Sequence, residues 1–281
     1  MSFLPRPGAG STLAGGPAAG EPARIVSLVP SHTETLYALG LASRVVGRTR
    51  FCIHPAPWVE AVPAVGGTKD ARLERILALR PDLVVADKDE NPKALADALL
   101  ENGVEVLWSE IDTVPDAAAF VERLADRCGV AAEGHRAAVA IRAALAEAAG
   151  AGGGARVFCP IWHGPWMTFD RTAYPSAMLE AVGLRNAFAG HAGPKYFQVE
   201  PAEVASSGAQ WTLLPTEPFP FHRRRVDTAP LGPAGQPGRV RAIDGEALTW
   251  FGVRTAPGLR ELARVARTLA VSGAAATPRS P

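Results

Sequence analysis

The sequence predicts an α/β protein with two Rossmann-like lobes, each built on a parallel sheet, joined by one long α-helix and enclosing a ligand cleft. Residues 83–86 are an apolar run without polar alternation, typical of a parallel strand covered on both faces. An amphipathic helix at 73–80 precedes that strand, and a similar helix–strand unit recurs within 199–219. Between the two copies, residues 131–149 form the most helix-prone segment of the chain.

The first lobe is expected to alternate strands with helices, which favours a parallel sheet with helices on both faces. Gly40 and Gly103 follow two of the expected helices, where glycine commonly ends a helix. The expected strands are 24–29, 45–47, 83–86 and 104–108, and the expected helices are 35–39, 73–80, 91–102 and 116–128.

The second lobe follows the glycine run at 150–154, which we interpret as a flexible break. Val204 aligns with Ile76 and Gln210 with Asp82, and the strands that follow align without a gap. The expected elements are strands at 156–162 and 211–214, a strand within 238–246, and helices at 174–182, 200–206 and 257–269.

These features divide the chain into five parts: a disordered leader (1–23), an N-terminal lobe (24–128), a connecting helix (129–150), a C-terminal lobe (151–271) and a disordered tail (272–281). The leader is rich in proline, glycine and alanine and is not a secretory signal as written, so the sequence as written indicates a cytoplasmic protein. No apolar run is long enough to span a bilayer.

The charge balance excludes a general nucleic-acid or anionic-membrane surface, because 29 Lys and Arg face 28 Asp and Glu. Cys52, Cys128 and Cys159 are widely spaced, which indicates small buried thiols rather than a disulfide framework or zinc site. The histidines show no metal-ligand spacing, so no metal residue is assigned.

Two segments, RIVSLVPSHTETLYALGL at 24–41 and VGGTKDARLERILALRPDLVVA at 65–86, resemble the helical-backbone periplasmic-binding-protein family. The resemblance covers about 24–269 and is nearest to the cobalamin-binding type. It implies a monomeric solute-binding protein of an ABC importer for cobalamin, siderophores or haem, outside the cytoplasm, with no catalytic cofactor and no catalysis. Cobalamin-binding members often have tryptophan where this chain has Thr68 and Lys69, so the ligand stays open among cobalamin, haem and a ferric chelate.

The resemblance also implies that one carboxylate of each lobe docks onto arginines of the permease, and Glu74 and Glu203 occupy similar places on the repeated helices. Solvated helix carboxylates are the alternative interpretation of both residues. An intracellular corrinoid- or haem-handling protein or enzyme that reuses the fold is the alternative function.

The candidate ligand-binding residues come from the loops that follow the strands, because ligands of open α/β sheets bind at the carboxyl ends of strands. Aromatic rings in these loops would stack on a flat ligand, although some rings can equally belong to the core. The aromatic candidates are Phe51, Trp162, Trp166, Tyr196, Phe219, Phe221 and Trp250. The polar candidates are Ser31, His32, His54, Lys69, Glu90, Asn91, Glu217, Asp244 and Arg254.

Catalytic residues are not assigned. Ser31, His32 and Glu34 are the residue types of a hydrolytic triad, but triad members converge from distant parts of a chain. The sequence has no nucleophile elbow, P-loop or dinucleotide-binding glycine motif.

Overall fold

The computed structural model describes residues 20–274, which divide into two compact units. Unit 1 holds the described residues up to Ile111 together with Pro115–Ala140 and Phe251–Arg254. Unit 2 holds Asp112–Val114, Ile141–Trp250 and the described residues from Thr255 onward. Most of the predicted leader and residues 275–281 of the predicted tail lie outside the described residues.

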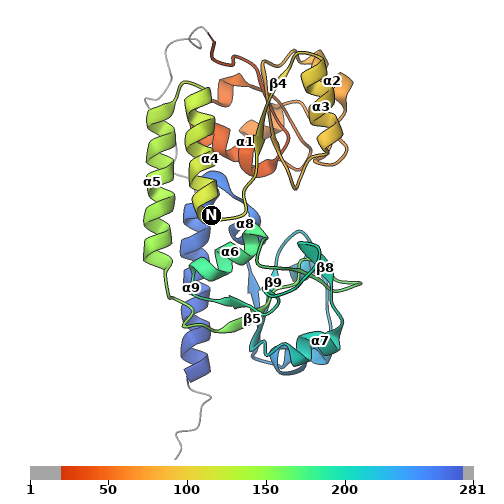
Figure 1. Ribbon diagram of the computed structural model, residues 1–281, viewed down its shortest axis with the longest axis vertical. Helices are drawn as coiled ribbons and strands as arrows, with labels where there is room; N and C mark the ends of the chain where they lie inside the picture. Colours follow the sequence, from red (N-terminus) through yellow and green to blue (C-terminus); the bar gives the residue numbers. More distant parts are fainter. Residues whose placement is uncertain (1–19, 275–281) are drawn as a thin grey trace, which may run out of the picture. The chain divides into compact units, whose positions relative to one another are not determined.

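Unit 1 is built on a four-stranded parallel sheet of order β2-β1-β3-β4. Figure 1 shows α2 and α3 on one side of these strands and α1 and α4 on the other. The strands are β1 (Ile25–Ser27), β2 (Val45–Arg48), β3 (Leu83–Asp87) and β4 (Glu105–Ser109). The helices are α1 (Pro30–Ala38), α2 (Leu73–Ala78), α3 (Lys93–Glu101) and α4 (Val114–Arg127), with 3-10 turns η1 (Ala42–Arg44), η2 (Trp58–Ala61) and η5 (Gly252–Arg254).

Unit 2 contains a second four-stranded parallel sheet, of order β10-β9-β5-β7. Its strands are β5 (Arg156–Phe158), β7 (Arg185–Asn186), β9 (Trp211–Pro215) and β10 (Val240–Ile243). Its helices are α6 (Tyr174–Ala181), α7 (Pro201–Ser206), α8 (Gly245–Thr249) and α9 (Thr255–Ala274), with 3-10 turns η3 (Phe221–Arg223) and η4 (Ala229–Gly235). The predicted α/β class with two parallel sheets is therefore confirmed.

The two sheets repeat one hydrogen-bond pattern at the start of their central strands. In unit 1 the Asp82 amide donates to the Arg24 carbonyl (2.8 Å), and Asp82 Oδ2 accepts from the Arg24 amide (2.8 Å). In unit 2 the Gln210 amide donates to the Arg156 carbonyl (2.8 Å), and Gln210 Oε1 accepts from the Arg156 amide (2.9 Å). The predicted alignment of Gln210 with Asp82 therefore holds at the level of individual atoms.

The helices before β3 and β9 are anchored by the other pair of aligned residues. Ile76 of α2 and Val204 of α7 are each almost fully buried in the core of their own unit. Burying an aliphatic side chain of this size stabilises the folded chain by about 1.5–3 kcal/mol. The helix–strand motif at 73–86 is thus a packing unit that the chain uses twice.

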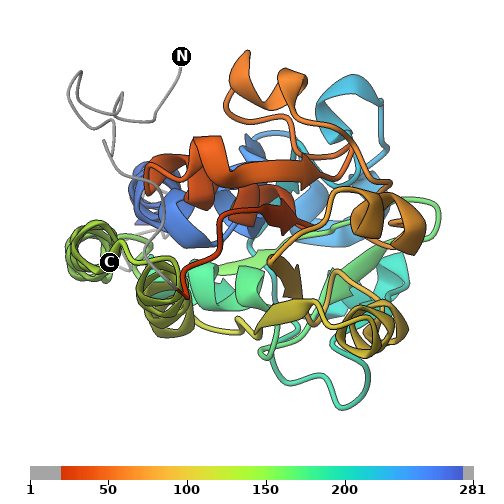
Figure 2. The same cartoon turned by 90° about the horizontal axis from the view of Figure 1, so that it is seen from above.

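The long helix α5 (Ala131–Ala148) lies beside α4, and Figure 2 shows the two helices end-on next to each other. Gly134 permits this approach, because a Cβ there would overlap the Ala125 side chain. The boundary between the units falls within α5, after Ala140. The glycine run after α5 is not free chain: the Gly152 and Gly154 amides donate to the carbonyls of Val182 (2.7 Å) and Gly183 (2.8 Å). At the other end of unit 2, α9 continues to Ala274, into the predicted tail.

One element of unit 2 differs from the expected loops. Strands β6 (Met167–Phe169) and β8 (Tyr196–Gln198) pair as an antiparallel ribbon. Tyr196 therefore lies in a strand rather than in a loop. Within residues 20–274, no helix combines the length and the apolar character needed to cross a membrane.

Candidate functional site

Three polar side chains form a buried chain at the carboxyl ends of the unit 1 strands. His32 Nε2 lies 2.8 Å from Ser109 Oγ, and Ser109 Oγ donates to Asp87 Oδ2 (2.6 Å). Because the Ser109 proton is directed to Asp87, His32 carries its own proton on Nε2. Burial, with a smaller contribution from Arg123, lowers the pKa of His32 to about 3, so the ring stays neutral at physiological pH.

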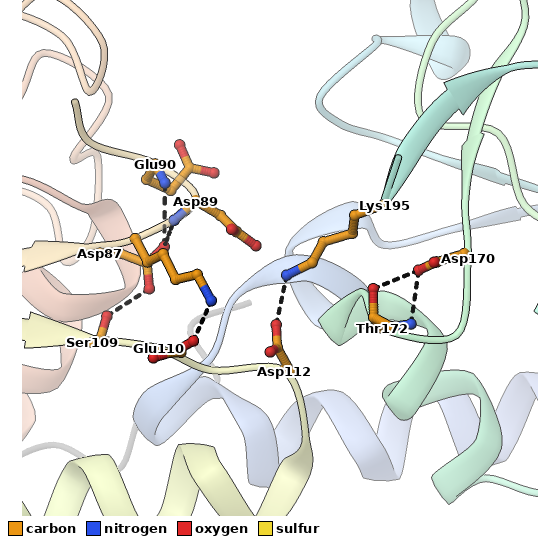
Figure 3. A network of polar contacts seen from close by, with 10 residues as sticks. Asp87, Asp89, Glu90, Ser109, Glu110, Asp112, Asp170, Thr172 and Lys195 are labelled. Carbon is orange, nitrogen blue, oxygen red and sulfur yellow. Dashed lines mark hydrogen bonds and ion pairs between the residues drawn. The ribbon is translucent and has the colours of Figure 1, made fainter. Parts of the chain in front are cut away.

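Asp87 also shapes the acidic loop that follows β3. Its Oδ1 accepts from the backbone amides of Asp89 (2.9 Å) and Glu90 (3.2 Å), as Figure 3 shows. Burial raises the pKa of Asp87 to about 6, and the neighbouring Asp89 and Glu90 carboxylates also raise it. The carboxylate is thus committed to holding the loop and is inaccessible to a ligand.

Asn91 connects three segments of unit 1. Its Oδ1 accepts from the Asp87 amide (2.8 Å), and its Nδ2 donates to the carbonyls of Thr68 (2.9 Å) and Leu28 (3.3 Å). The structure gives this predicted ligand residue a bracing role between the loops that follow β1 and β3 and the glycine-rich loop.

Arg254 is another predicted ligand residue with an internal partner. It belongs to unit 1, where its guanidinium makes two hydrogen bonds with Glu34, Nε to Oε2 at 2.7 Å and Nη2 to Oε1 at 2.6 Å. The Glu34 side chain is 0% exposed. Arg254 neutralises this buried carboxylate, which is the usual condition for burying a charge.

Ser31 and His32 are buried as well, on the first turn of α1. The His32 ring lies between Phe120 (centroids 4.6 Å apart) and Phe251 (5.0 Å). Within the described residues, Ser31 Oγ and His32 Nδ1 have no hydrogen-bond partner. Both residues are therefore part of the buried interior of unit 1.

The accessible candidates of unit 1 lie in the loops after β2 and β3. Phe51 is 49% exposed, and the Arg50 guanidinium lies 4.8 Å from its ring centre while bonding to Asp70 (3.0 Å). His54 and Glu90 are half-buried, and the exposed Lys69 ammonium donates to the Asp89 carbonyl.

The loop aromatics of unit 2 form one cluster with a buried and an exposed part. Trp166 is only 7% exposed and stacks on Phe221 (6.1 Å, 11° between planes) within the core. Trp162 is 44% exposed and meets the half-buried Phe219 edge to face (5.4 Å). His163 lies between these parts, 4.5 Å from Trp166 and 5.9 Å from Phe219. The ring surface open to a ligand is therefore that of Trp162 and Phe219.

Glu217 and Trp250 hold each other inside unit 2. Glu217 Oε1 accepts from Trp250 Nε1 (2.6 Å) and from Thr249 Oγ1 (3.0 Å), and burial raises the pKa of Glu217. Asp244 is exposed, but its Oδ1 caps α8 by accepting from the Glu246 amide (2.9 Å). All three predicted ligand residues thus have structural roles within unit 2.

A polar pair that the sequence did not single out lies near the start of β8. Lys195 Nζ lies 2.6 Å from Asp112 Oδ1, and both residues belong to unit 2 (Figure 3). The partners are 83 residues apart, so no local pattern could reveal them. Tyr196, the next residue, is 39% exposed.

The two predicted docking carboxylates are exposed on the short repeated helices. Glu74 lies in the first turn of α2, and Glu203 in the first turn of α7. Glu203 also accepts from the Glu200 amide (2.7 Å) as part of a capping box, a local role that Glu74 lacks. Among the residues that the structure describes, no group of three or more His, Cys, Asp or Glu could hold a metal ion.

Comparison with known proteins shows which family the chain resembles. The profile of the family described as "Periplasmic binding protein" matches residues 25–246. A "Vitamin B12-binding protein" of Vibrio parahaemolyticus is 31% identical over 184 residues, which are 64% of this chain and 66% of that protein. The chain thus aligns with slightly less than two thirds of this relative.

Two solved structures share the fold over nearly their whole length. The periplasmic vitamin B12 binding protein BtuF of Vibrio cholerae has a TM-score of 0.78 at 24% identity, covering 88% of this chain and 98% of that one. The periplasmic heme-binding protein RhuT from Roseiflexus sp. RS-1, in apo form, has a TM-score of 0.77 at 23% identity, with the same coverage. Because the family profile spans most of the chain, the resemblance of segments 24–41 and 65–86 is confirmed, and this chain belongs to the periplasmic binding protein family.

Proposed function

We propose that this chain is a solute-binding protein that holds a cobalamin-like or other metal-chelate ligand on loops that follow its strands. The observation that carries the proposal is the ring pair of the exposed Trp162 and the half-buried Phe219, which follow two strands of the unit 2 sheet. A flat macrocycle gains both apolar burial and stacking on such rings. The relatives named for vitamin B12 and the neighbour named for heme bring the same ligand classes into consideration.

Binding without chemistry is part of this proposal. In the Asp87–Ser109–His32 chain the serine proton is directed to the aspartate, and the histidine donates to the serine. A nucleophilic serine needs the opposite polarity, with a histidine that takes its proton. All three groups are also buried, so a substrate could not reach them.

Delivery to an ABC permease, outside the cytoplasm, is the biological role that we propose for this binding. Family membership supports it, and the exposed Glu74 and Glu203 are the contacts that we assign to the permease. The cleft that the sequence predicts between the units stays a prediction.

Titration of the purified full chain with cyanocobalamin, cobinamide, haemin and ferric chelates, followed by absorbance and calorimetry, tests the ligand class. We expect at least one ligand to bind with a Kd of about 1 μM or below. Trp162→Ala should weaken that binding roughly tenfold, because loss of a stacked ring removes about 1–3 kcal/mol.

Leu100→Ala is the matched control, because Leu100 is a large exposed apolar residue on α3. It should leave the affinity unchanged. Absence of binding by every ligand would refute the proposed function, whereas equal effects of the two variants would move the site away from Trp162.

A further inference from the structure

A run of four basic residues follows the aromatic segment after β9. His222, Arg223, Arg224 and Arg225 are all exposed, and the run begins within η3. The chain as a whole is nearly neutral, so three consecutive arginines are a marked local concentration of charge.

Arg223, Arg224 and Arg225 differ from Arg50 and Arg254, arginines of other loops that follow strands, in lacking a carboxylate partner among the described residues. Arg50 is paired with Asp70 and Arg254 with Glu34. Within the described residues, Arg223, Arg224 and Arg225 form no ion pair with a carboxylate. Arg223 Nε donates to His222 Nε2 (3.0 Å), a contact that orients the guanidinium without neutralising it.

The arginines follow closely in sequence the aromatic residues Phe219 and Phe221, which contact other rings of the unit 2 cluster. Phe221, which opens η3, is buried against Trp166 and lies 4.7 Å from Phe219. Phe219 in turn meets Trp162. The basic run is therefore attached to a rigid aromatic anchor, immediately next to the rings on which a flat ligand would stack.

We propose that residues 222–225 are a subsite for carboxylate groups on the rim of a flat metal chelate stacked on Trp162 and Phe219. Guanidinium groups bind carboxylates through paired, charge-assisted hydrogen bonds. These bonds are stronger than the hydrogen bonds that a guanidinium makes with a neutral amide. The subsite therefore selects a carboxylate-bearing macrocycle over an amide-bearing corrin. This inference rests on the proposed function and narrows its ligand class.

The test compares three forms of the full chain: wild type, the variant Arg223→Gln/Arg224→Gln/Arg225→Gln, and a control, Arg72→Gln/Arg75→Gln/Arg267→Gln. The control arginines are exposed and lie on or next to α2 and on α9, so the control makes the same change of net charge. Haemin, which carries two carboxylates, and its dimethyl ester, which carries none, are the probes, with cobinamide as the amide-bearing comparison.

Wild type should bind haemin at least about tenfold more tightly than the ester or cobinamide. The 223–225 variant should lose that advantage, while the control variant should keep it within about threefold. Increasing salt should weaken haemin binding to wild type more than to the 223–225 variant.

Each contrary result has a distinct meaning. If wild type binds cobinamide or cobalamin more tightly than haemin, or if the 223–225 variant binds haemin as wild type does, the subsite is wrong and the proposed function stands. If the control variant loses as much affinity as the 223–225 variant, the effect is net charge alone and the subsite is again refuted. If wild type binds none of these probes but binds cyanocobalamin or a ferric chelate, the subsite is wrong and the proposed function stands. If it binds none of the probes and neither cyanocobalamin nor a ferric chelate, the proposed function itself fails.

Discussion

Thr212 has a buried hydroxyl that contributes no hydrogen bond to the described part of the fold. Thr212 lies fully buried in β9, and within the described residues its Oγ1 has no hydrogen-bond partner. The alignment of Gln210 with Asp82 places Val84 at the equivalent position of unit 1, also fully buried. Valine has nearly the same shape as threonine, so the repeat itself indicates the apolar alternative.

Thr212→Val should therefore raise the free energy of unfolding by about 1 kcal/mol, because it removes an unsatisfied buried polar group. Urea denaturation followed by circular dichroism measures the change. Thr168→Val is the matched control, because the buried Thr168 hydroxyl donates to the Cys159 carbonyl (2.8 Å) and its loss should destabilise the chain. A destabilised Thr212→Val variant would contradict the assignment of an unpartnered hydroxyl.

Asp87 should make stability depend on pH in an unusual direction. Its pKa rises from 3.8 to about 6 on folding, so the folded chain binds this proton more tightly than the unfolded chain. The contribution of Asp87 to stability is therefore fully present below pH 3.8 and is lost as the pH rises through 6. The loss totals roughly 3 kcal/mol, at about 1.36 kcal/mol per pKa unit.

The variant Asp87→Asn removes this titration, and its stability relative to wild type should rise steadily between pH 4 and pH 7. Urea unfolding at several pH values and constant ionic strength measures this difference. Asp97→Asn is the control, because Asp97 is an exposed partner of Lys93 on α3. A difference between wild type and Asp87→Asn that does not change with pH would show that Asp87 titrates normally.

The predicted site residues differ in how exposed they are, for a physical reason. Phe51, Trp162 and Tyr196 are exposed, as a ligand surface requires. Trp166 and Trp250 come from similar loop sequences but are buried, because each has partners distant in sequence, namely Phe221 and Glu217. Loop composition indicates which side chains can stack on a ligand, and tertiary partners decide which remain available.

At the scale of elements, the repeated helix–strand unit could be predicted because its pattern is local. A helical apolar face, a proline and an apolar run specify α2 and β3. The helical face and the apolar run recur in α7 and β9, with Ala209 at the position of Pro81. The β6–β8 ribbon was not predicted, because each strand has only three residues and their pairing is not local. The assignment of Phe251–Arg254 to unit 1 also depends on partners about 220 residues away.

Within the segment Phe251–Arg254, Gly252 is the residue that the local backbone and packing require to be glycine. It has a φ of +76°, and a Cβ there would overlap the Thr35 hydroxyl. That hydroxyl is fixed, because it donates to the Ser31 carbonyl (2.7 Å) and accepts from the Val253 amide (3.2 Å). Glycine is therefore required for both its backbone angle and its lack of a side chain.

Gly252→Ala should lower the free energy of unfolding by about 2 kcal/mol or more, since strain at a positive φ and an overlap act together. Gly238→Ala is the matched control: its φ is +86°, and a Cβ there would meet nothing within 4 Å. It should cost about 1 kcal/mol, the backbone strain alone. Equal losses in thermal or urea unfolding would show that Thr35 moves aside without cost.

For the whole molecule, the class, the two parallel sheets and the family could be derived from sequence, because they follow from patterns that extend along the chain. The division into units is less simple than a single boundary at the connecting helix. Asp112–Val114 lies between segments of unit 1 but belongs to unit 2, and Phe251–Arg254 lies between segments of unit 2 but belongs to unit 1. The stability of unit 1 thus depends on a residue, Arg254, encoded just before the last helix of unit 2.

Arg254→Met should therefore destabilise unit 1 from a distant point in the chain. It leaves the Glu34 carboxylate buried without its partner, a change that costs about 3–5 kcal/mol. Hydrogen exchange should show lost protection in β1 and β3 of unit 1 as well as around residue 254. The double variant Glu34→Leu/Arg254→Met removes both charges and should recover most of the loss, because apolar replacement of a buried ion pair is often close to neutral. Loss of protection confined to residues 251–254, or a double variant as unstable as the single one, would show that this pair does not support unit 1.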